Sequence, residues 1–209
     1  MTPTNTTAAG RARARRLALA TALGAAALLS GAGEGRAFEL IGIDWDYRSR
    51  PMGEPWEICT RGVPDGAAAV IRRAAAVWNY GRFRFTFKGN GCSSGGAWPR
   101  VNGVNQIDFG SQGGATLAAN VSFGRGGDAQ ECDMRFNSDV PWYVGTGSVP
   151  AGRYDLFSVA VHEFGHCLGL GHSDVQPPPV MFRSFRSRET RRTLRTDDRR
   201  GRAAIYGGG

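Results

Sequence analysis

The chain has 209 residues, 41% of them hydrophobic and 21% charged, with a formal net charge of +8 at pH 7. That length suits one domain with a hydrophobic core of its own. The basic charge does not indicate nucleic-acid binding, because the arginines are not interleaved with aromatic residues that could stack on bases. The apolar run at 17–29 is shorter than the ~20 residues of a membrane span, so we do not expect a transmembrane protein.

The first 37 residues have the pattern of a secretory signal peptide. Four arginines at positions 11–16 precede the apolar run, and the segment ends on a small-x-Ala site at Ala37. We therefore expect residues 1–37 to be removed and residues 38–209 to form a secreted domain. The segment carries five arginines and one glutamate, so it holds +4 of the net charge. Cleavage after Ala32 and export by the twin-arginine route remain alternatives.

The spacing of apolar residues in the remaining chain predicts five strands and three helices. The expected strands are 56–60, 82–88, 105–109, 116–123 and 130–136. We expect Asp65 to cap a first helix, Asp155 a second, and Thr196 a third that Gly207 ends. Residues 173–193 should be irregular, because they contain three consecutive prolines.

All three histidines of the chain fall within the sequence HEFGHCLGLGH, at His162, His166 and His172. His162 and His166 lie on one helix face one turn apart, and Gly169 allows a reversal that brings His172 to them. Three imidazoles with an open fourth position are typical of a catalytic zinc site, and Glu163 is placed to act as general base. The alternative, a helix with histidines in its core, does not explain why Glu163 and Gly169 are in register.

This motif, followed by a methionine at Met181, is the metzincin signature, and the chain resembles the matrixin branch in a short bacterial form. The segments WNYGRFRFTF, ECDMRFNSDVPW and LRTDDRRGRAAIYG also resemble that branch, so the likeness spans about 38–207. It implies an α+β fold, a mixed five-stranded sheet with three helices. It further implies a monomeric endopeptidase with one zinc ion, whose peptide or protein substrate lies along the edge strand 116–123.

The chain departs from the matrixin pattern in two respects. It has no histidines for the second, structural zinc of many matrixins, and no cysteine precedes position 38 to silence the enzyme. Calcium bound by Asp128, Asp133 and Asp139 is possible by composition, but acids in glycine-rich loops are more often simple turn residues.

The four cysteines of an exported protein are expected to form two disulfides, with three connectivities possible. Cys132 and Cys167 stand where similar proteins often have alanine. This resemblance favours the pairs Cys132–Cys167 and Cys59–Cys92 over the alternatives, among them a free thiol at Cys167.

In some matrixins the new N-terminus contacts an acid of the closing helix. The resemblance places Phe38 at that terminus, Asp197 as its partner and Asp198 as a brace for the methionine turn. The simpler interpretation is that both acids only stabilise the start of a helix.

Nine arginines lie between positions 183 and 202, against three acids. They could form a cationic wall that favours acidic substrates or anionic surfaces. The simpler interpretation, which we favour here, is a solvated loop and helix face. For the function as a whole, the alternatives to a secreted zinc endopeptidase are a zinc-bearing binding or adhesion module with little turnover and a zinc hydrolase of non-peptide amides.

Overall fold

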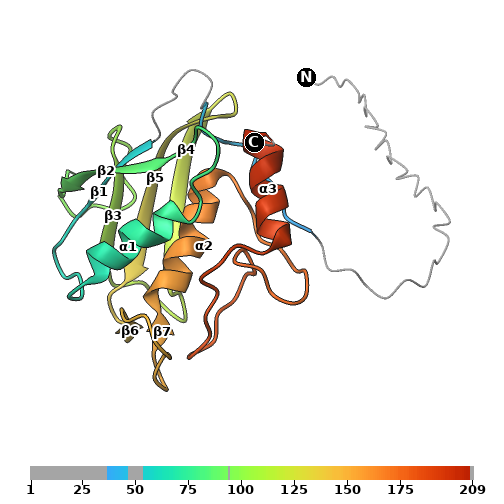
Figure 1. Ribbon diagram of the computed structural model, residues 1–209. Helices are drawn as coiled ribbons and strands as arrows, with labels where there is room; N and C mark the ends of the chain where they lie inside the picture. The colour runs from blue at the N-terminus through green and yellow to red at the C-terminus, as the bar shows by residue number, and fades with distance from the viewer. Residues whose placement is uncertain (1–36, 47–53, 94, 208–209) are drawn as a thin grey trace, which may run out of the picture. The chain divides into compact units, whose positions relative to one another are not determined.

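The computed structural model describes residues 37–46, 54–93 and 95–207 (Figure 1). The expected signal peptide therefore lies outside the described residues, apart from its last position. The main sheet has the strand order β2-β1-β3-β5-β4. Its strands are β1 (Glu54–Ile58), β2 (Phe85–Asn90), β3 (Asn105–Gly110), β4 (Ala118–Arg125) and β5 (Asp128–Asn137). β4 runs antiparallel to β5 and forms one edge, whereas the other pairings are parallel.

Three helices complete the described part: α1 (Ala67–Ala76), α2 (Leu156–Leu168) and α3 (Thr196–Tyr206). The expected α+β fold, with a mixed five-stranded sheet and three helices, is confirmed. Figure 1 shows α1 and α2 on one face of the sheet, with α3 beyond α2. No helix of the described residues has the length and apolar composition needed to cross a membrane.

Helix α2 is buried along almost its whole length, because it packs against the sheet and against α1. Phe164 packs its ring against Trp56 of β1, with 5.3 Å between centroids. On another side, the indole of Trp78 donates a 2.7 Å hydrogen bond to the Val161 carbonyl. The core therefore fixes the position of α2, the helix that carries the first two histidines of the motif.

The helix ends agree only in part with the expected caps. Asp155 accepts a hydrogen bond from the Ser158 amide at 3.1 Å and so caps α2 as predicted, and α3 ends at Gly207. The caps predicted for the other two helices are wrong. Gly66 occupies the N-cap of α1, in a left-handed conformation, in place of Asp65, and Arg195 precedes α3 in place of Thr196.

The strand boundaries differ where local pairing competes with the sheet. Tyr80 and Phe83 pair with each other, with N···O distances of 3.2 and 2.9 Å, so β2 begins only at Phe85. Two short parallel strands were not predicted, β6 (Trp142–Tyr143) and β7 (Tyr154–Asp155). At two residues each, they are too short to show an alternating pattern. The stretch 173–193 contains no helix or strand, as expected.

Both disulfides follow the favoured connectivity. Cys59 pairs with Cys92 and Cys132 with Cys167, with Cα atoms 4.5 and 5.8 Å apart. The second bridge joins β5 to the last turn of α2, and both of its cysteines are buried. It therefore links the sheet covalently to the helix of the histidine motif.

Replacing Cys132 and Cys167 together by alanine should lower the free energy of unfolding by about 2–4 kcal/mol. Without the bridge the unfolded chain is no longer closed into a loop, so its conformational entropy rises. The matched control is the double alanine variant of Cys59 and Cys92, whose sequence separation of 33 is close to the 35 of the first pair. Denaturant titration without reductant measures the free energy of unfolding of both double variants. An unfolding midpoint equal to that of the parent would show that the buried bridge does not stabilise the fold.

Candidate metal centre

The three predicted histidines come together in the structure. His162 and His166 project from successive turns of α2, with 3.1 Å between their Nε2 atoms. The helix ends at Gly169, whose φ of 117° lies in the left-handed region that only glycine adopts easily. The chain then reverses, and His172 joins the pair. One ligand atom from each histidine lies within 4.8 Å of the others, and no other group of this kind is found in the part of the chain that the structure describes.

Backbone carbonyls determine which ring nitrogens face the centre. The Nδ1 atom of His162 lies 2.8 Å from the Val180 carbonyl, and that of His166 lies 2.7 Å from the Leu170 carbonyl. A carbonyl oxygen can only accept, so Nδ1 carries the proton in both rings and Nε2 keeps its lone pair. Metal-binding histidines are commonly oriented in this way, by a hydrogen bond from the ring nitrogen that faces away from the metal.

Burial keeps these rings neutral. It lowers the pKa of His162 well below the ordinary value, and lowers the pKa of His166 and of His172 to smaller extents. Two nitrogen ligands at about 2.0–2.1 Å from a tetrahedral ion lie about 3.3 Å apart, close to the 3.1 Å seen between His162 and His166. Neutral imidazoles at this spacing fit a zinc ion.

Glu163 lies beside the histidines and is buried. Burial raises the pKa of its carboxyl group to about 7, and a hydrogen bond from Asn120 acts in the opposite direction. The Asn120 side-chain amide, on the edge strand β4, donates to Oε2 of Glu163 at 2.9 Å. Sequence reasoning did not single out Asn120. The only signal in the sequence is that Asn120 is polar, whereas its neighbours in this edge strand are mostly small and apolar.

Met181 lies against α2, the helix that carries His162 and His166. A side chain at Gly165 of α2 would overlap both the Met181 sulfur and the Trp78 ring, so the close approach requires glycine. Asp198 of α3 accepts hydrogen bonds from the Val180 and Met181 amides, each at 3.0 Å. The predicted brace between the closing helix and the methionine turn is therefore present.

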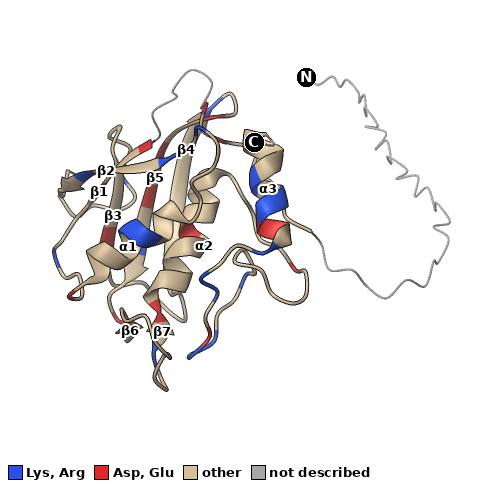
Figure 2. Ribbon diagram, viewed as in Figure 1, with Lys and Arg blue, Asp and Glu red and all other residues tan. Residues whose placement is uncertain are grey.

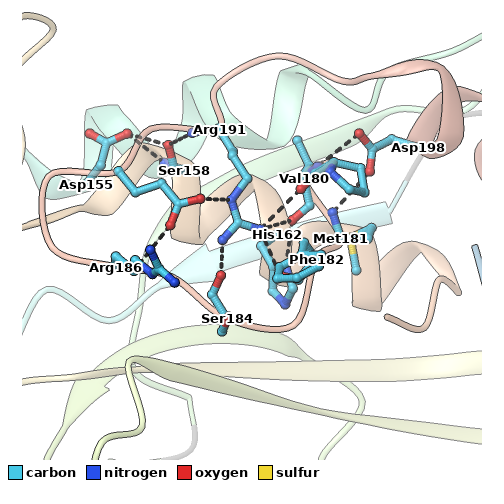
Figure 3. A network of polar contacts seen from close by, with 12 residues as sticks. Asp155, Ser158, His162, Val180, Met181, Phe182, Ser184, Arg186, Arg191 and Asp198 are labelled. Carbon is cyan, nitrogen blue, oxygen red and sulfur yellow. Dashed lines mark hydrogen bonds and ion pairs between the residues drawn. The ribbon is translucent and has the colours of Figure 1, made fainter. Parts of the chain in front are cut away.

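Arg191 is a second residue that sequence reasoning missed (Figure 3). Its guanidinium is buried beneath the loop that follows Met181 and donates to the Phe182 carbonyl at 2.8 Å and to the Ser184 carbonyl. Its Nε pairs with Glu189 at 3.0 Å, and its backbone amide donates to the Ser158 hydroxyl of α2 at 2.7 Å. One arginine therefore fixes the course of an otherwise irregular loop. A single arginine among nine gives no sequence signal for that role.

A cleft of about 630 Å³ runs over the histidines and Glu163. One wall is formed by residues 115–120, which lead into the start of β4, and the other includes Arg183, Ser184 and Phe185. Among the described residues β4 pairs only with β5, so its other edge could pair with an extended chain.

The described N-terminal segment is hydrogen-bonded to the turn between α2 and His172. The Ile41 amide donates to the Gly169 carbonyl at 3.0 Å, and the Gly171 amide donates to the Glu39 carbonyl at 2.8 Å. The Phe38 amide donates to Oδ1 of Asp197 at 3.2 Å, which agrees with the residue pairing that the resemblance implied.

The acids considered for calcium have other partners. Asp133 is buried and accepts from the Arg100 and Gln106 amides at 2.9 and 3.2 Å, and burial raises its pKa to about 6. Asp139 accepts from the Ser111 hydroxyl at 2.5 Å, and Asp128 forms no metal-ligand group with described residues. The structure therefore gives no support for calcium at these positions.

Comparisons with known proteins extend the picture. A family model described as Matrixin matches residues 65–207. Matrix metalloproteinase-2 of Drosophila melanogaster is 39% identical over 84 residues, which are 40% of this chain and 10% of that protein. Neutrophil collagenase of Homo sapiens is 37% identical over 111 residues, which are 53% of this chain and 21% of that protein. The chain thus spans about a tenth to a fifth of the length of these relatives.

Among solved structures, one described as the structure of myroilysin covers 81% of this chain and 98% of its own, at a TM-score of 0.46 and 13% identity. At that level the likeness supports no functional conclusion.

Proposed function

The chain belongs to the matrixin family, whose model covers more than half of it, and on that premise we propose that it is a secreted zinc-dependent endopeptidase. The observation that carries this proposal is the cluster of three neutral imidazoles beside a buried carboxylate in an open cleft. A module that only binds would gain nothing from a carboxylate held in that position.

His162, His166 and His172 are the proposed zinc ligands, through Nε2 in the first two. A zinc ion bound there lowers the pKa of water to about 7 and polarises a carbonyl group. The three rings leave one side of the site open, because no fourth histidine, cysteine or acid of the described residues joins them. The protein contributes the orientation of the rings, through the Val180 and Leu170 carbonyls.

Glu163 is the proposed general base. A carboxyl group with a pKa of about 7 can take a proton from water in the cleft and deliver it to the leaving amine, because neither transfer is strongly uphill. The amide of Asn120 holds one oxygen of this carboxylate, so the other can face the reacting water. Asn120 is a positioning residue in this account.

The proposed substrate is an extended peptide paired with the free edge of β4. Strand addition to a sheet edge provides main-chain hydrogen bonds independent of sequence, while pockets read alternate side chains. Residues 115–120 line the cleft along that edge, opposite Phe185. The carbonyl of a peptide lying there would pass over the histidines.

Replacing Glu163 by glutamine should reduce kcat on a denatured protein or a fluorogenic peptide by about 100-fold or more, since general-base catalysis is lost. One zinc ion per chain should remain, measured by inductively coupled plasma mass spectrometry. The His172→Ala variant should lose both activity and zinc. Equal cleavage by the glutamine variant and the parent would refute the assigned mechanism, and a parent without zinc would refute the assigned metal.

Asn120→Ala should lower kcat by about 10- to 100-fold with little change in KM, because a hydrogen bond to a charged group is worth about 1.5–3 kcal/mol. The kcat of Asn120→Asp should be no higher than that of Asn120→Ala, because a carboxylate cannot donate a hydrogen bond to Glu163. Val121→Ala, at the next position of β4, controls for damage to the strand. A rise in KM at constant kcat would instead mean that Asn120 contacts substrate.

Secretion is proposed from the N-terminal sequence and is supported by two disulfides, which are typical of oxidising compartments. Cleavage after Ala37 would turn the Phe38 amide, 3.2 Å from Asp197, into an ammonium group next to that carboxylate. Mass spectrometry of the exported protein should therefore find Phe38 as the first residue, and Asp197→Asn should weaken activity modestly, by about 2- to 5-fold. A mature chain that begins at Gly33 with full activity would contradict this role.

A further inference from the structure

The cleft does not end at the metal centre. A second hollow of about 530 Å³ adjoins it, and Ser184 lines both. The walls of this hollow include Phe182, Arg186, Arg188 and Glu189. A peptide that extends from the histidines past Ser184 would therefore enter a space bordered by two arginines.

The hollow carries an uncompensated positive charge. Arg186 and Arg188 are exposed, and neither guanidinium has an ion-pair or hydrogen-bond partner among the described residues. Glu189 does not neutralise them, because its oxygens accept from the Arg186 backbone amide at 2.9 Å and from Nε of buried Arg191 at 3.0 Å. The nearby Arg183 differs, since its guanidinium already pairs with Asp174 at 2.7 Å.

The backbone that carries the two free arginines is held in place. The Arg188 amide donates to the Arg153 carbonyl at 3.1 Å, and the Gly152 amide donates to the Ser187 hydroxyl at 3.0 Å. Arg188 has a φ of 69°, a left-handed conformation that a residue other than glycine keeps only when its surroundings enforce it. Arg191 donates to the Phe182 and Ser184 carbonyls of the same loop (Figure 3).

The opposite wall of the cleft differs in charge. Residues 115–120, which form this wall, contain no ionisable side chain. Figure 2 shows that basic residues occur on several helices, strands and loops of the chain. Arg186 and Arg188 are the two that line the hollow.

We propose that this hollow is a substrate subsite for carboxylate side chains, so that the enzyme prefers peptides with an aspartate or glutamate on one side of the scissile bond. The proposal rests on the endopeptidase function proposed above. Guanidinium groups form charge-assisted, often bidentate hydrogen bonds with carboxylates, which suits both free arginines. Both are solvent-exposed, so each contact should change the rate only several-fold.

The test uses fluorogenic peptides in which aspartate, asparagine or lysine is placed in turn at each of several positions on both sides of the scissile bond. At low ionic strength, the aspartate peptide should exceed its asparagine counterpart by about 3- to 10-fold in kcat/KM, at positions on one side only. Lysine there should be disfavoured. Added salt should shrink the preference, because exposed charges are screened.

The variant that tests the assignment combines Arg186→Gln with Arg188→Asn, since asparagine tolerates the left-handed conformation of position 188. It should bring the aspartate-to-asparagine ratio close to one. The matched control combines Arg73→Gln with Arg200→Gln, which removes two exposed charges from α1 and α3 and should leave the ratio as in the parent.

Equal cleavage of aspartate and asparagine peptides by the parent would overturn the subsite, as would a preference that survives in the Arg186 and Arg188 variant. A parent that cleaves none of the peptides would overturn the endopeptidase function itself, and this result is distinct from cleavage without preference.

Discussion

The hydrogen bond between Nδ1 of His162 and the Val180 carbonyl joins the metal centre to the rest of the molecule. It fixes the tautomer of the ring, and it depends on a turn that has no regular structure of its own. That turn is held by Asp198, which accepts from the Val180 and Met181 amides and thereby ties the turn to α3. The orientation of a ligand on the central helix is therefore controlled by the last helix of the chain.

The histidine site could be predicted because local spacing is enough to build it. Two histidines four residues apart share a helix face in any helix, and Gly169 supplies the one reversal that the third requires. Asn120 and Arg191 could not be found in this way. Asn120 acts on Glu163, which is 43 positions distant. Arg191 holds the loop at Phe182 and Ser184, but it is one of nine arginines in its segment. The wrong caps are displacements of one residue at the start of each helix. Gly66 and Arg195 adopt the capping positions although the residues expected to cap lie immediately next to them.

On the far side of the sheet, backbone amides and an arginine satisfy the buried acids. Glu131 and Asp133 of β5 accept backbone amides from the loop before β3, at Asn102, Gly103 and Arg100. Asp108 instead pairs with Arg135 at 2.6 Å. Amide donors satisfy the carboxylates and attach the loop to the sheet in the same contacts. The acid-rich composition of this segment is therefore explained by loop anchoring, which a sequence pattern alone cannot separate from cation binding.

The three histidines are not held equally firmly. His162 and His166 belong to a helix that is buried in the core and linked to the sheet by the Cys132–Cys167 bridge. His172 lies beyond the residues 132–167 that this disulfide encloses. Its neighbours Gly169 and Gly171 form backbone hydrogen bonds with Ile41 and Glu39. The site thus combines two histidines on a helix that is bridged to the sheet with a third on the loop that follows this helix. Strain applied to the first residues of the folded domain would reach the loop of His172 through these two hydrogen bonds, and would reach His166 through the Leu170 carbonyl that contacts its Nδ1 atom.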